Sequence, residues 1–480
     1  MNGVGLPIRQ APNRNRQTDI LSSSPTLSKR HKHARSSYSE SSPLVSRNNS
    51  LTFRPAKRQM PTPDKTIAVI NASGRQAASL IRVVTVLGYT VRAQLRDLEG
   101  VIATEVSTNP NVECIVGELY TRHRPTEENK DVSRNGPLSG VGVNHDLISE
   151  LFRGAHLAFI NTTYYGNEVQ IGKALADAAK KAGIQHYIYS SMPDHALHNP
   201  EWPSCPLWSS KFKVERYIRE IGLPATFVYT GIYNNNFTSL PYPLFCMELQ
   251  PDGSFLWQAP FSEKRKIPFL DAEHDVGPAV YQIFKEGPKK WNGRRIPLAY
   301  EMLTPIEVCE AFERGIGRPV RYVRGPIEIK VPIPEGYRDQ LETLEKLFTI
   351  GRGDPKKQAP PYFADIEMEK SCPAEAMRLW EGPRGMEEYA REIFPLEEHA
   401  NGLRWMEEGD DEEEEEEEEE AEEEEHTDDS TPAEGRNGAA RNGNRRFDGN
   451  DDSDDGEYSE DGDEDEGLVM RNRSGPNRSR

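Results

Sequence analysis

The chain has 480 residues, of which 35% are hydrophobic and 29% are charged, and its formal net charge at pH 7 is −19. This length allows two or three domains, and the sequence pI of about 5.2 is a property of an acidic C-terminal segment, so the global charge says nothing about DNA binding by the folded part. No stretch approaches the roughly 18 apolar residues of a membrane span, and the first residues lack an apolar segment, so we expect neither membrane insertion nor export.

The two ends of the chain differ in charge from its middle. Residues 1–64 contain eleven Lys or Arg and three Asp or Glu, whereas residues 407–480 contain thirty-two acidic and eight basic residues. Neither end shows apolar periodicity, so we expect a disordered basic arm over 1–64 and a disordered acidic tail over 407–480. The middle is nearly neutral and carries no helix-turn-helix or zinc-finger motif, which argues against direct DNA binding.

The arm contains the basic cluster Lys29–Arg35, which is typical of nuclear import signals and also common in unstructured arms. The five cysteines are scattered, without a C-x-x-C pair or an adjacent histidine cluster: Cys114, Cys205, Cys246, Cys309 and Cys372. This pattern indicates a reducing intracellular compartment and no zinc site. We therefore predict that the protein lies in the nucleus, the cytoplasm or both.

Between residues 65 and 239, short β-branched runs alternate with helical patterns. Strands are predicted at Thr66–Ile70, Thr90–Gln94, Val112–Val116, Leu157–Ile160, Tyr187–Ser190 and Ala225–Tyr229, and helices near 75–87, 99–107, 145–153, 167–182 and 208–221. This alternation predicts an α/β fold of the Rossmann type, a doubly wound parallel sheet with helices on both faces. We expect this domain to span 65–238, with a surface insertion over about 121–142.

The loop after the first strand reads Asn71-Ala72-Ser73-Gly74-Arg75-Gln76-Ala77. A dinucleotide fingerprint has three glycines, and here only the middle one is kept, although Asn71 can adopt a left-handed turn and Ala77 is small enough for close packing. The helix that starts near Arg75 would offer unpaired N–H groups to a phosphate. An ordinary strand–turn–helix corner would look similar, so this loop alone does not show that a dinucleotide binds.

Three later strands end in small or polar residues at the same predicted edge. They are followed by Arg96-Asp97-Leu98, by Gly117-Glu118 and, after Ile160, by Asn161-Thr162-Thr163. An enzyme strict for NAD normally has an acidic residue where Arg96 stands, so Arg96 suits the 2′-phosphate of NADP while Asp97 leaves NAD open. Each loop alone is an ordinary loop start, but their convergence predicts a bound dinucleotide.

After the fifth strand, the residues Leu207 to Glu215 follow the Y-x-x-S-K-x-x-x-E frame of the extended short-chain dehydrogenases. Leu207 stands where the proton-transferring tyrosine belongs, and Lys211 is kept. Leucine neither donates nor accepts a proton, so we expect a protein that binds a dinucleotide without catalysis. The alternative for Lys211 is a solvated helix lysine.

Three tyrosines are alternative proton donors, Tyr187, Tyr229 and Tyr233, of which Tyr233 has the best reach because it lies in a loop. The same loop contains three consecutive asparagines. Buried amides need partners, so we expect the segment Asn235-Asn236-Phe237-Thr238 to face the carboxamide or ribose of the dinucleotide. A plain polar turn is the alternative.

Beyond residue 239 the alternation loosens, and we expect a smaller α+β lobe over 239–406. Its predicted elements are the helices Ala272–Glu286 and Pro305–Arg314 and the strand Arg295–Ala299. A last helix, Gly385–Glu392, is predicted to return to the core before the acidic tail.

Four strings of this chain resemble the fungal NmrA regulators of nitrogen metabolite repression: Ile188–His195 (IYSSMPDH), Gly231–Thr238 (GIYNNNFT), Leu270–Gly277 (LDAEHDVG) and Met386–Glu392 (MEEYARE). The match covers about residues 65–406. The resemblance implies a Rossmann-fold member of the short-chain dehydrogenase superfamily that binds oxidised NAD and NADP without turnover. It also implies a negative transcriptional regulator that binds a GATA-type zinc-finger activator of nitrogen catabolic genes.

The resemblance further implies cofactor contacts at the positions that match the family: Ile70, Asn71, Ala72, Ser73, Gly74, Arg75, Arg96, Asp97, Leu98, Gly117, Glu118, Ile160, Asn161, Thr162, Lys211, Asn235, Asn236, Phe237 and Thr238. Arg96 departs from the histidine of the family, which leaves the preference between NAD and NADP open. The insertion near 121–142 and both tails lie outside the family pattern.

We therefore predict a dinucleotide-sensing co-repressor that acts as an interaction protein. The alternative is an NADPH-dependent reductase of the isoflavone or quinone reductase type, several of which rely on the lysine without that tyrosine. The acidic tail would either compete with DNA for a basic zinc-finger partner or keep the protein soluble.

Overall fold

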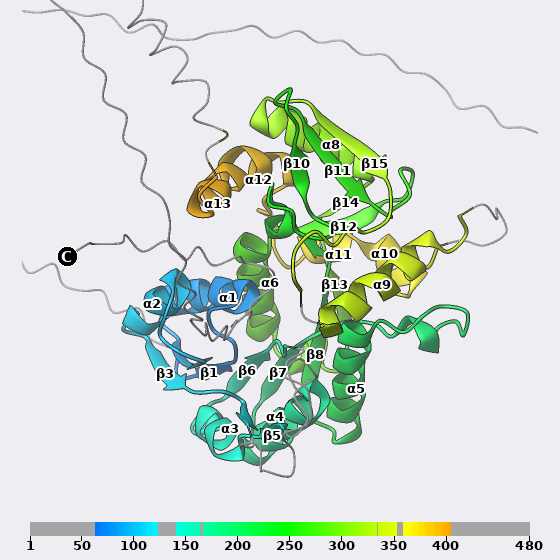
Figure 1. Cartoon of the computed structure of the whole chain (residues 1–480). Helices are drawn as coiled ribbons and strands as arrows, with labels where there is room; N and C mark the ends of the chain where they lie inside the picture. Colours follow the sequence, from blue (N-terminus) through cyan, green and yellow to red (C-terminus); the bar gives the residue numbers. More distant parts are fainter. Residues whose placement is uncertain are drawn as a thin grey trace, which may run out of the picture. The chain divides into compact units, whose positions relative to one another are not determined.

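The computed structural model of this chain describes residues 63–122, 141–163, 167–333, 335–352, 359–403 and 405. The predicted disordered arm and tail lie outside these residues, apart from the last two residues of the arm. The main element is a seven-stranded sheet in which every pair of neighbouring strands is parallel, in the order β13-β8-β7-β6-β1-β2-β3 (Figure 1).

The first six strands of this sheet are β1 (Thr66–Val69), β2 (Thr90–Leu95), β3 (Val112–Val116), β6 (Leu157–Ile160), β7 (His186–Ser191) and β8 (Ala225–Thr230). Each lies within one residue of its predicted bounds, because buried β-branched runs bounded by turns mark strands of a parallel sheet. β1 pairs with β2 on one side and with β6 on the other, so the strand order reverses at β1. The doubly wound α/β fold is thus confirmed.

Helices cover both faces of the sheet. α1 (Arg75–Val86), α2 (Val101–Thr108) and α6 (Ala272–Glu286) pack on one face, and α3 (His145–Phe152), α4 (Glu168–Ala182) and α5 (Pro206–Glu220) pack on the other (Figure 1). In α1 the buried residues Leu80, Ile81 and Val84 share one side of the helix, as the 3.6-residue period requires. These helices confirm the predicted ones.

The structure corrects the predicted assignment of two elements to the smaller lobe. β13 (Arg295–Leu298) pairs with β8 and extends the large sheet, and α6 packs against α1 on that sheet. Local sequence patterns identify a strand or a helix, but they do not say which sheet edge it joins, since that depends on contacts between distant segments. The predicted boundary near residue 239 stays a prediction.

Two smaller sheets are formed by strands from residue 232 onward. One contains β10 (Met247–Leu249), β11 (Phe255–Ala259) and β15 (Val320–Arg324), and the other contains β9 (Ile232–Tyr233), β12 (Ile267–Leu270) and β14 (Glu301–Leu303). α8 (Pro305–Ile316) confirms a predicted helix and packs against β15. The strands β4 (Tyr120–Arg122) and β5 (Val141–Val143) pair at the base of the predicted insertion, and residues 123–140 lie outside the described part.

The remaining elements are short or close the chain: η2 (His195–Leu197), η3 (Asn234–Asn236), α7 (Pro288–Trp291), α9 (Glu335–Thr349), α10 (Ile366–Ser371), α11 (Ala374–Met377), α12 (Met386–Glu392) and α13 (Phe394–Ala400). α12 confirms the helix predicted over 385–392, but it is followed by α13 and is not the last helix. Pro395 lies in the first turn of α13, where its missing N–H costs no hydrogen bond. Among the described helices, none is long and apolar enough to cross a membrane.

Candidate functional site

The carboxyl ends of β1, β2, β3 and β6 meet at one edge of the large sheet, where they surround a small hollow. Its lining residues are Asn71, Gln94, Arg96, Leu119, Tyr120, Thr162, Thr163 and Ile171. Three of the sequence-predicted contacts, Asn71, Arg96 and Thr162, therefore lie together. In doubly wound folds this edge, beside the point where the strand order reverses, is where ligands bind.

Asn71 forms the turn after β1 in the left-handed conformation expected from the sequence, with φ of 47°. Its side-chain amide donates to the carbonyl of Asn161 over 2.8 Å, and its backbone N–H donates to Oε1 of Gln94 over 2.9 Å. These bonds join the ends of β1, β6 and β2, so the turn has a fixed shape. A Cβ at Gly74 would lie 3.1 Å from the Asn71 carbonyl oxygen, a tight contact that favours glycine there.

The start of α1 carries no side-chain cap and no acidic residue in its first turn. Helix N-termini leave backbone N–H groups without intrahelical partners, so this end suits an anionic group. The guanidinium of Arg75 is engaged elsewhere, because its Nη1 lies 2.5 Å from Glu273 on α6 and 2.9 Å from Glu397 on α13. The backbone of Arg75, rather than its charge, is therefore the group offered to a phosphate.

The ends of β2 and β3 keep their predicted residues at the edge. Arg96 and Asp97 are half-buried, and Leu98 is 51% exposed. Gly117 has φ of 147°, a backbone conformation that favours glycine; a Cβ there would lie 2.5 Å from Cδ1 of Leu147, a side-chain end that could move. The carbonyl of Glu118 accepts from the amide of Asn144.

Ile70 and Ala72 are buried beside the turn, Ser73 is half-buried within it, and Ile160 ends β6 inside the core. These four residues contribute backbone groups and packing to the edge of the sheet, rather than exposed side chains. Their predicted contacts with a cofactor stay predictions.

Lys211 lies on α5 and points at the end of β6. Its ammonium donates to the Thr162 carbonyl and, over 3.0 Å, to Oε1 of Glu168, whose side chain is only 1% exposed. Glu168 also accepts from the hydroxyls of Thr162 and Ser210. Lys211 is thus neither a solvated helix lysine nor a free charge: it is the cation of a nearly buried ion pair at the cleft.

Leu207 lies one helical turn before Lys211, at the second residue of α5, and its backbone N–H donates to Gln340 of α9. Ser191, at the end of β7, donates to Glu215 over 2.9 Å. Glu215 is fully buried and also accepts from Tyr229 over 2.8 Å. This serine is therefore occupied by a protein carboxylate.

The tyrosines near the cleft are held by protein groups. Tyr189 is fully buried, bonds with the Thr162 hydroxyl over 2.9 Å, and has a pKa raised well above its usual range by burial and then by Glu168. Tyr233 accepts from the side-chain amide of Gln76, and burial raises its pKa. A phenol with a raised pKa holds its proton more tightly, so neither group is prepared to act as an acid at neutral pH.

The asparagine loop differs from the sequence expectation in one respect. The Asn235 amide does not face an open cleft: its Oδ1 accepts from the backbone of Ala272 over 3.0 Å and its Nδ2 donates to Glu397 over 3.3 Å. Asn234 is fully buried, and its amide has no partner among the described residues. Asn236 is half-buried.

The last two residues of the predicted contact segment are also tied to the protein. Phe237 packs into the aromatic core of the smaller sheets, with Trp257 and Phe312 both 5.1 Å away between ring centroids. The Thr238 hydroxyl donates to Glu398 over 2.8 Å. Contact of this segment with a dinucleotide remains a prediction.

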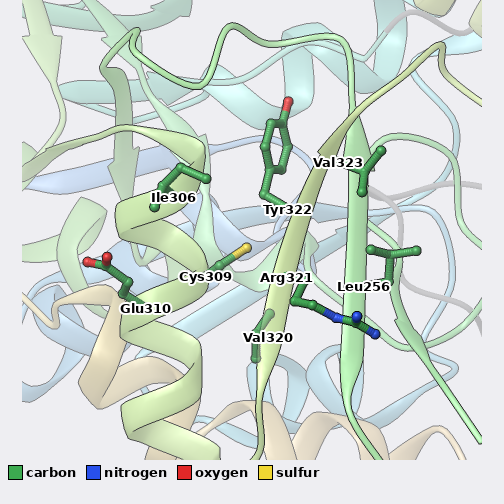
Figure 2. Close-up of a pocket in the computed structure, with 8 residues that line it drawn as sticks. All are labelled: Leu256, Ile306, Cys309, Glu310, Val320, Arg321, Tyr322 and Val323. Carbon is green, nitrogen blue, oxygen red and sulfur yellow. The ribbon is translucent and has the colours of Figure 1, made fainter.

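A second hollow, of about 570 Å³, lies between α8 and the smaller sheet. Figure 2 shows its lining residues, which are Leu256, Ile306, Cys309, Glu310, Val320, Arg321, Tyr322 and Val323. None of them belongs to the sequence-predicted set, and the walls are mainly aliphatic. We therefore place the functional site at the carboxyl edge of the large sheet, although the hollow there is smaller.

Sequence reasoning missed the carboxylates that organise the cleft: Glu168, Glu397 and Glu398, together with Gln94. Glu168 carries a weak signal, because it follows the helix-capping Asn167 and precedes an apolar helix. The other two lie in a Glu-Glu pair that resembles a solvated helix face. The five cysteines are unpaired, and the described residues form no cluster of potential metal ligands.

Residues 63–390 match the model of the NmrA-like family. The chain belongs to the NmrA-like family. It is 71% identical over 408 residues to the nitrogen metabolite repression protein nmr of Neurospora crassa, a match that covers 84% of this chain and 83% of the relative. It is 53% identical to the nitrogen metabolite repression protein nmrA of Emericella nidulans, covering 71% of this chain and 98% of that protein.

Solved structures of NmrA, described as a negative transcriptional regulator, have the same fold. Two of them, one in complex with NAD and one in complex with NADP, are 56% identical to this chain, with a TM-score of 0.63. Each match covers 71% of this chain and 99% of the solved one. The resemblance seen in four short strings is thus confirmed over most of this NmrA-like chain.

Proposed function

We propose that this chain is a negative regulator of transcription in nitrogen metabolite repression, which binds oxidised NAD or NADP at the carboxyl edge of its large sheet and does not turn it over. The observation that carries the proposal is the 71% identity to the Neurospora repression protein over 84% of the chain. The geometry of the cleft supports the proposal independently. The residues at the sheet edge suit a nucleotide, and Leu207 stands where the dehydrogenase frame has its proton donor.

The residues present fit a dinucleotide. The uncapped start of α1 would hold the diphosphate, and Arg96 and Asp97 would face the adenosine ribose, with the backbone of Gly117 beside them. Lys211 would hold the nicotinamide ribose, and the loop 235–238 would border the ring. When bound, the nicotinamide supplies hydride acceptor or donor chemistry.

Leu207 supports the absence of turnover. Loss of a positioned general acid lowers a reaction rate by on the order of 10² to 10⁴. Tyr189 and Tyr233 are bonded within the protein and have raised pKa values, so they do not replace it. The role that remains for Lys211 is to order the cleft and bind ribose hydroxyls.

Purified full-length protein tests the cofactor half of this proposal. Calorimetry should show saturable binding of NAD and of NADP, and the Arg96→Glu variant should weaken NADP more than NAD, because it places a negative charge beside the 2′-phosphate. With NADPH and a panel of quinones and carbonyls, absorbance at 340 nm should fall by no more than one equivalent. Sustained multiple turnover would instead favour the atypical reductase.

The partner half concerns a GATA-type zinc-finger activator. We expect direct binding of an isolated GATA-type zinc-finger domain, and a redox-sensing role requires that its affinity change when the cleft is saturated, since an effector acts only through a difference between states. Calorimetry of the zinc finger with and without saturating NAD measures this coupling. Equal affinities would remove the sensing role and leave the repressor role, whereas no binding would remove the partner.

A further inference from the structure

The last helix of the described residues, α13, places two consecutive carboxylates, Glu397 and Glu398, against the proposed cleft. The helix is fixed by aromatic packing, because the ring of Phe394 lies 5.1 Å from that of Phe312 and 6.0 Å from that of Trp405 between centroids. Figure 1 shows it in orange beside α12. Consecutive residues of a helix point about 100° apart, so the two carboxylates reach two different segments.

Glu397 anchors α13 to the start of α1 and to the asparagine loop. Its Oε1 accepts from Arg75 over 2.9 Å and from Asn235 over 3.3 Å, and its Oε2 accepts from Tyr389 over 2.6 Å. Burial raises the pKa of this carboxyl, and Arg75 opposes that shift. Both oxygens are thus occupied, and the position of α13 relative to the large sheet is fixed.

Glu398 holds the end of the same loop. Its side chain is fully buried; Oε1 accepts from the Thr238 hydroxyl over 2.8 Å, and Oε2 accepts from the Ser239 backbone over 3.0 Å and from the Ser239 hydroxyl. A further bond comes from the indole of Trp405 over 3.3 Å. A buried carboxylate with several donors is costly to disturb, because each broken bond leaves a polar group without a partner.

Thr238 transmits this anchoring to the loop. Its hydroxyl donates to Glu398 and accepts from the backbone of Leu240 over 3.2 Å, and its carbonyl accepts from Met247 over 2.7 Å. The loop is therefore held by β10 on one side and by α13 on the other. Without Glu398, α13 would hold this loop only through the 3.3 Å bond from Asn235 to Glu397.

The position of this loop decides which half of a dinucleotide it would serve. It follows β9, which comes after β8, whereas β2 and β3 lie at the opposite end of the sheet order. In doubly wound folds the end of β2 binds the adenosine ribose, so the segment beyond β8 borders the nicotinamide half.

We propose that Glu398 is a positioning residue of the cleft, which acts through Thr238 and Ser239 to hold the loop that borders the nicotinamide half of a bound dinucleotide. This inference rests on the proposed function. Under this proposal, α13 helps to shape the cofactor site. The helix is remote in sequence from the fingerprint at Asn71–Arg75.

The test compares a whole dinucleotide with its adenosine half in the full chain. Glu398→Gln replaces one of the two acceptor oxygens with an amide donor, so at least one of the bonds from Thr238, Ser239 and Trp405 is lost and the loop is held less firmly. Calorimetry should show NAD binding about 10-fold weaker, while ADP-ribose, which lacks the nicotinamide, should bind within about twofold of the parent protein. A general loss of stability would not produce this split.

Two further variants keep the test decisive. Ser239→Ala removes one donor at a residue outside the predicted contact set, and should give the same split at about threefold. Glu301→Gln is the matched control, because Glu301 is a largely buried carboxylate that accepts from the Met386 N–H at the start of α12. Glu301 forms none of the hydrogen bonds that hold the loop 235–239. The control variant should lower the unfolding temperature and leave both affinities unchanged.

The outcomes separate the two proposals. If the parent protein binds neither NAD nor ADP-ribose, the proposed function is wrong. If it binds both, and Glu398→Gln and Ser239→Ala weaken both ligands equally or neither, only the positioning role is overturned. If Glu398→Gln does not fold, Ser239→Ala alone decides whether the positioning role holds. A loss of affinity for NAD without a matching loss for ADP-ribose supports the role, and equal affinities overturn it.

Discussion

Lys211 and Glu168 have a structural role at the residue scale that the dehydrogenase frame does not reveal. The frame assigns Lys211 to a ribose and a catalytic phenol, yet here its ammonium is 3.0 Å from a carboxylate that is 1% exposed. Removing one partner of a nearly buried ion pair leaves the other charge uncompensated, which is more damaging than removing both. The presence of Lys211 in a chain without the tyrosine thus has a physical reason besides cofactor binding.

Lys211→Met should accordingly lower the free energy of unfolding by about 3–5 kcal/mol, because Glu168 then lies buried without its cation. The double variant Lys211→Met/Glu168→Gln should recover a large part of that loss, since a neutral amide can still bond with Thr162 and Ser210. Urea denaturation measures both. An equal loss in the single and double variants would show that the pair does not act as a unit.

The sequence predicts the backbone conformation of some residues at the site, but not the hydrogen-bond partners of their side chains. The left-handed turn at Asn71 follows from backbone sterics, which are local, and it is confirmed. The partners of Asn235 and Thr238 were not predictable, because Ala272 and Glu398 are far away in the chain. A buried polar side chain in a sequence predicts that a hydrogen-bond partner exists, but it does not identify the residue that provides that partner.

At the scale of elements, the contact between α1 and α6 closes one face of the large sheet. Gly277 on α6 donates its N–H to Oγ of Ser79 over 2.9 Å, and a Cβ at Gly277 would lie 2.6 Å from the Ser79 carbonyl carbon. Backbone cannot move aside without shifting a whole helix. The glycine therefore sets how closely α6 approaches the helix that starts at the cofactor edge.

Gly277→Ala should lower the free energy of unfolding by about 1–3 kcal/mol through overpacking. Gly172→Ala is the comparison with a side-chain obstacle, since a Cβ there would lie 2.5 Å from Cγ2, 2.8 Å from Cγ1 and 3.2 Å from Cβ of Val214. Val214 is buried and stiff at χ1 within α5, so Gly172→Ala should also destabilise the fold, but the double variant Gly172→Ala/Val214→Ala should recover part of that loss. Thermal or urea unfolding compares the variants, and no recovery in the double variant would contradict the distinction between backbone and side-chain obstacles.

At the scale of the whole molecule, two buried histidines link stability to pH. Burial lowers the pKa of His186 to about 4, with a smaller effect of Lys65, and burial likewise lowers that of His195 to about 4. Each ring is held through Nε2, by Thr226 and by the Pro361 carbonyl, and no described residue bonds Nδ1. The folded chain therefore keeps both rings neutral, whereas the unfolded chain protonates them near pH 6.5.

The sign follows from these shifts: the stabilising contribution is fully present above the unfolded pKa and is lost as pH falls toward the folded pKa. Between pH 6.5 and 5 the free energy of unfolding should fall by up to about 1.4 kcal/mol per pH unit for each histidine. Carboxyls with raised pKa values, such as Asp275 and Glu301, oppose this loss, because the folded chain binds their protons more tightly than the unfolded chain does. Urea titrations at several pH values measure the slope, which the double variant His186→Gln/His195→Gln should flatten; an unchanged slope would assign it to other groups.

The sequence by itself determined the strand–helix alternation, the family resemblance and the chemistry of the turns at the sheet edge. These depend on periodicity and backbone sterics within a few residues, which a chain carries wherever it folds. Only the tertiary structure decided that β13 completes the large sheet, that Lys211 is paired with Glu168, and that α13 supports the loop at 235–239. Such contacts join segments up to about 160 residues apart, and their partners are selected by the packing of the whole core rather than by any local preference.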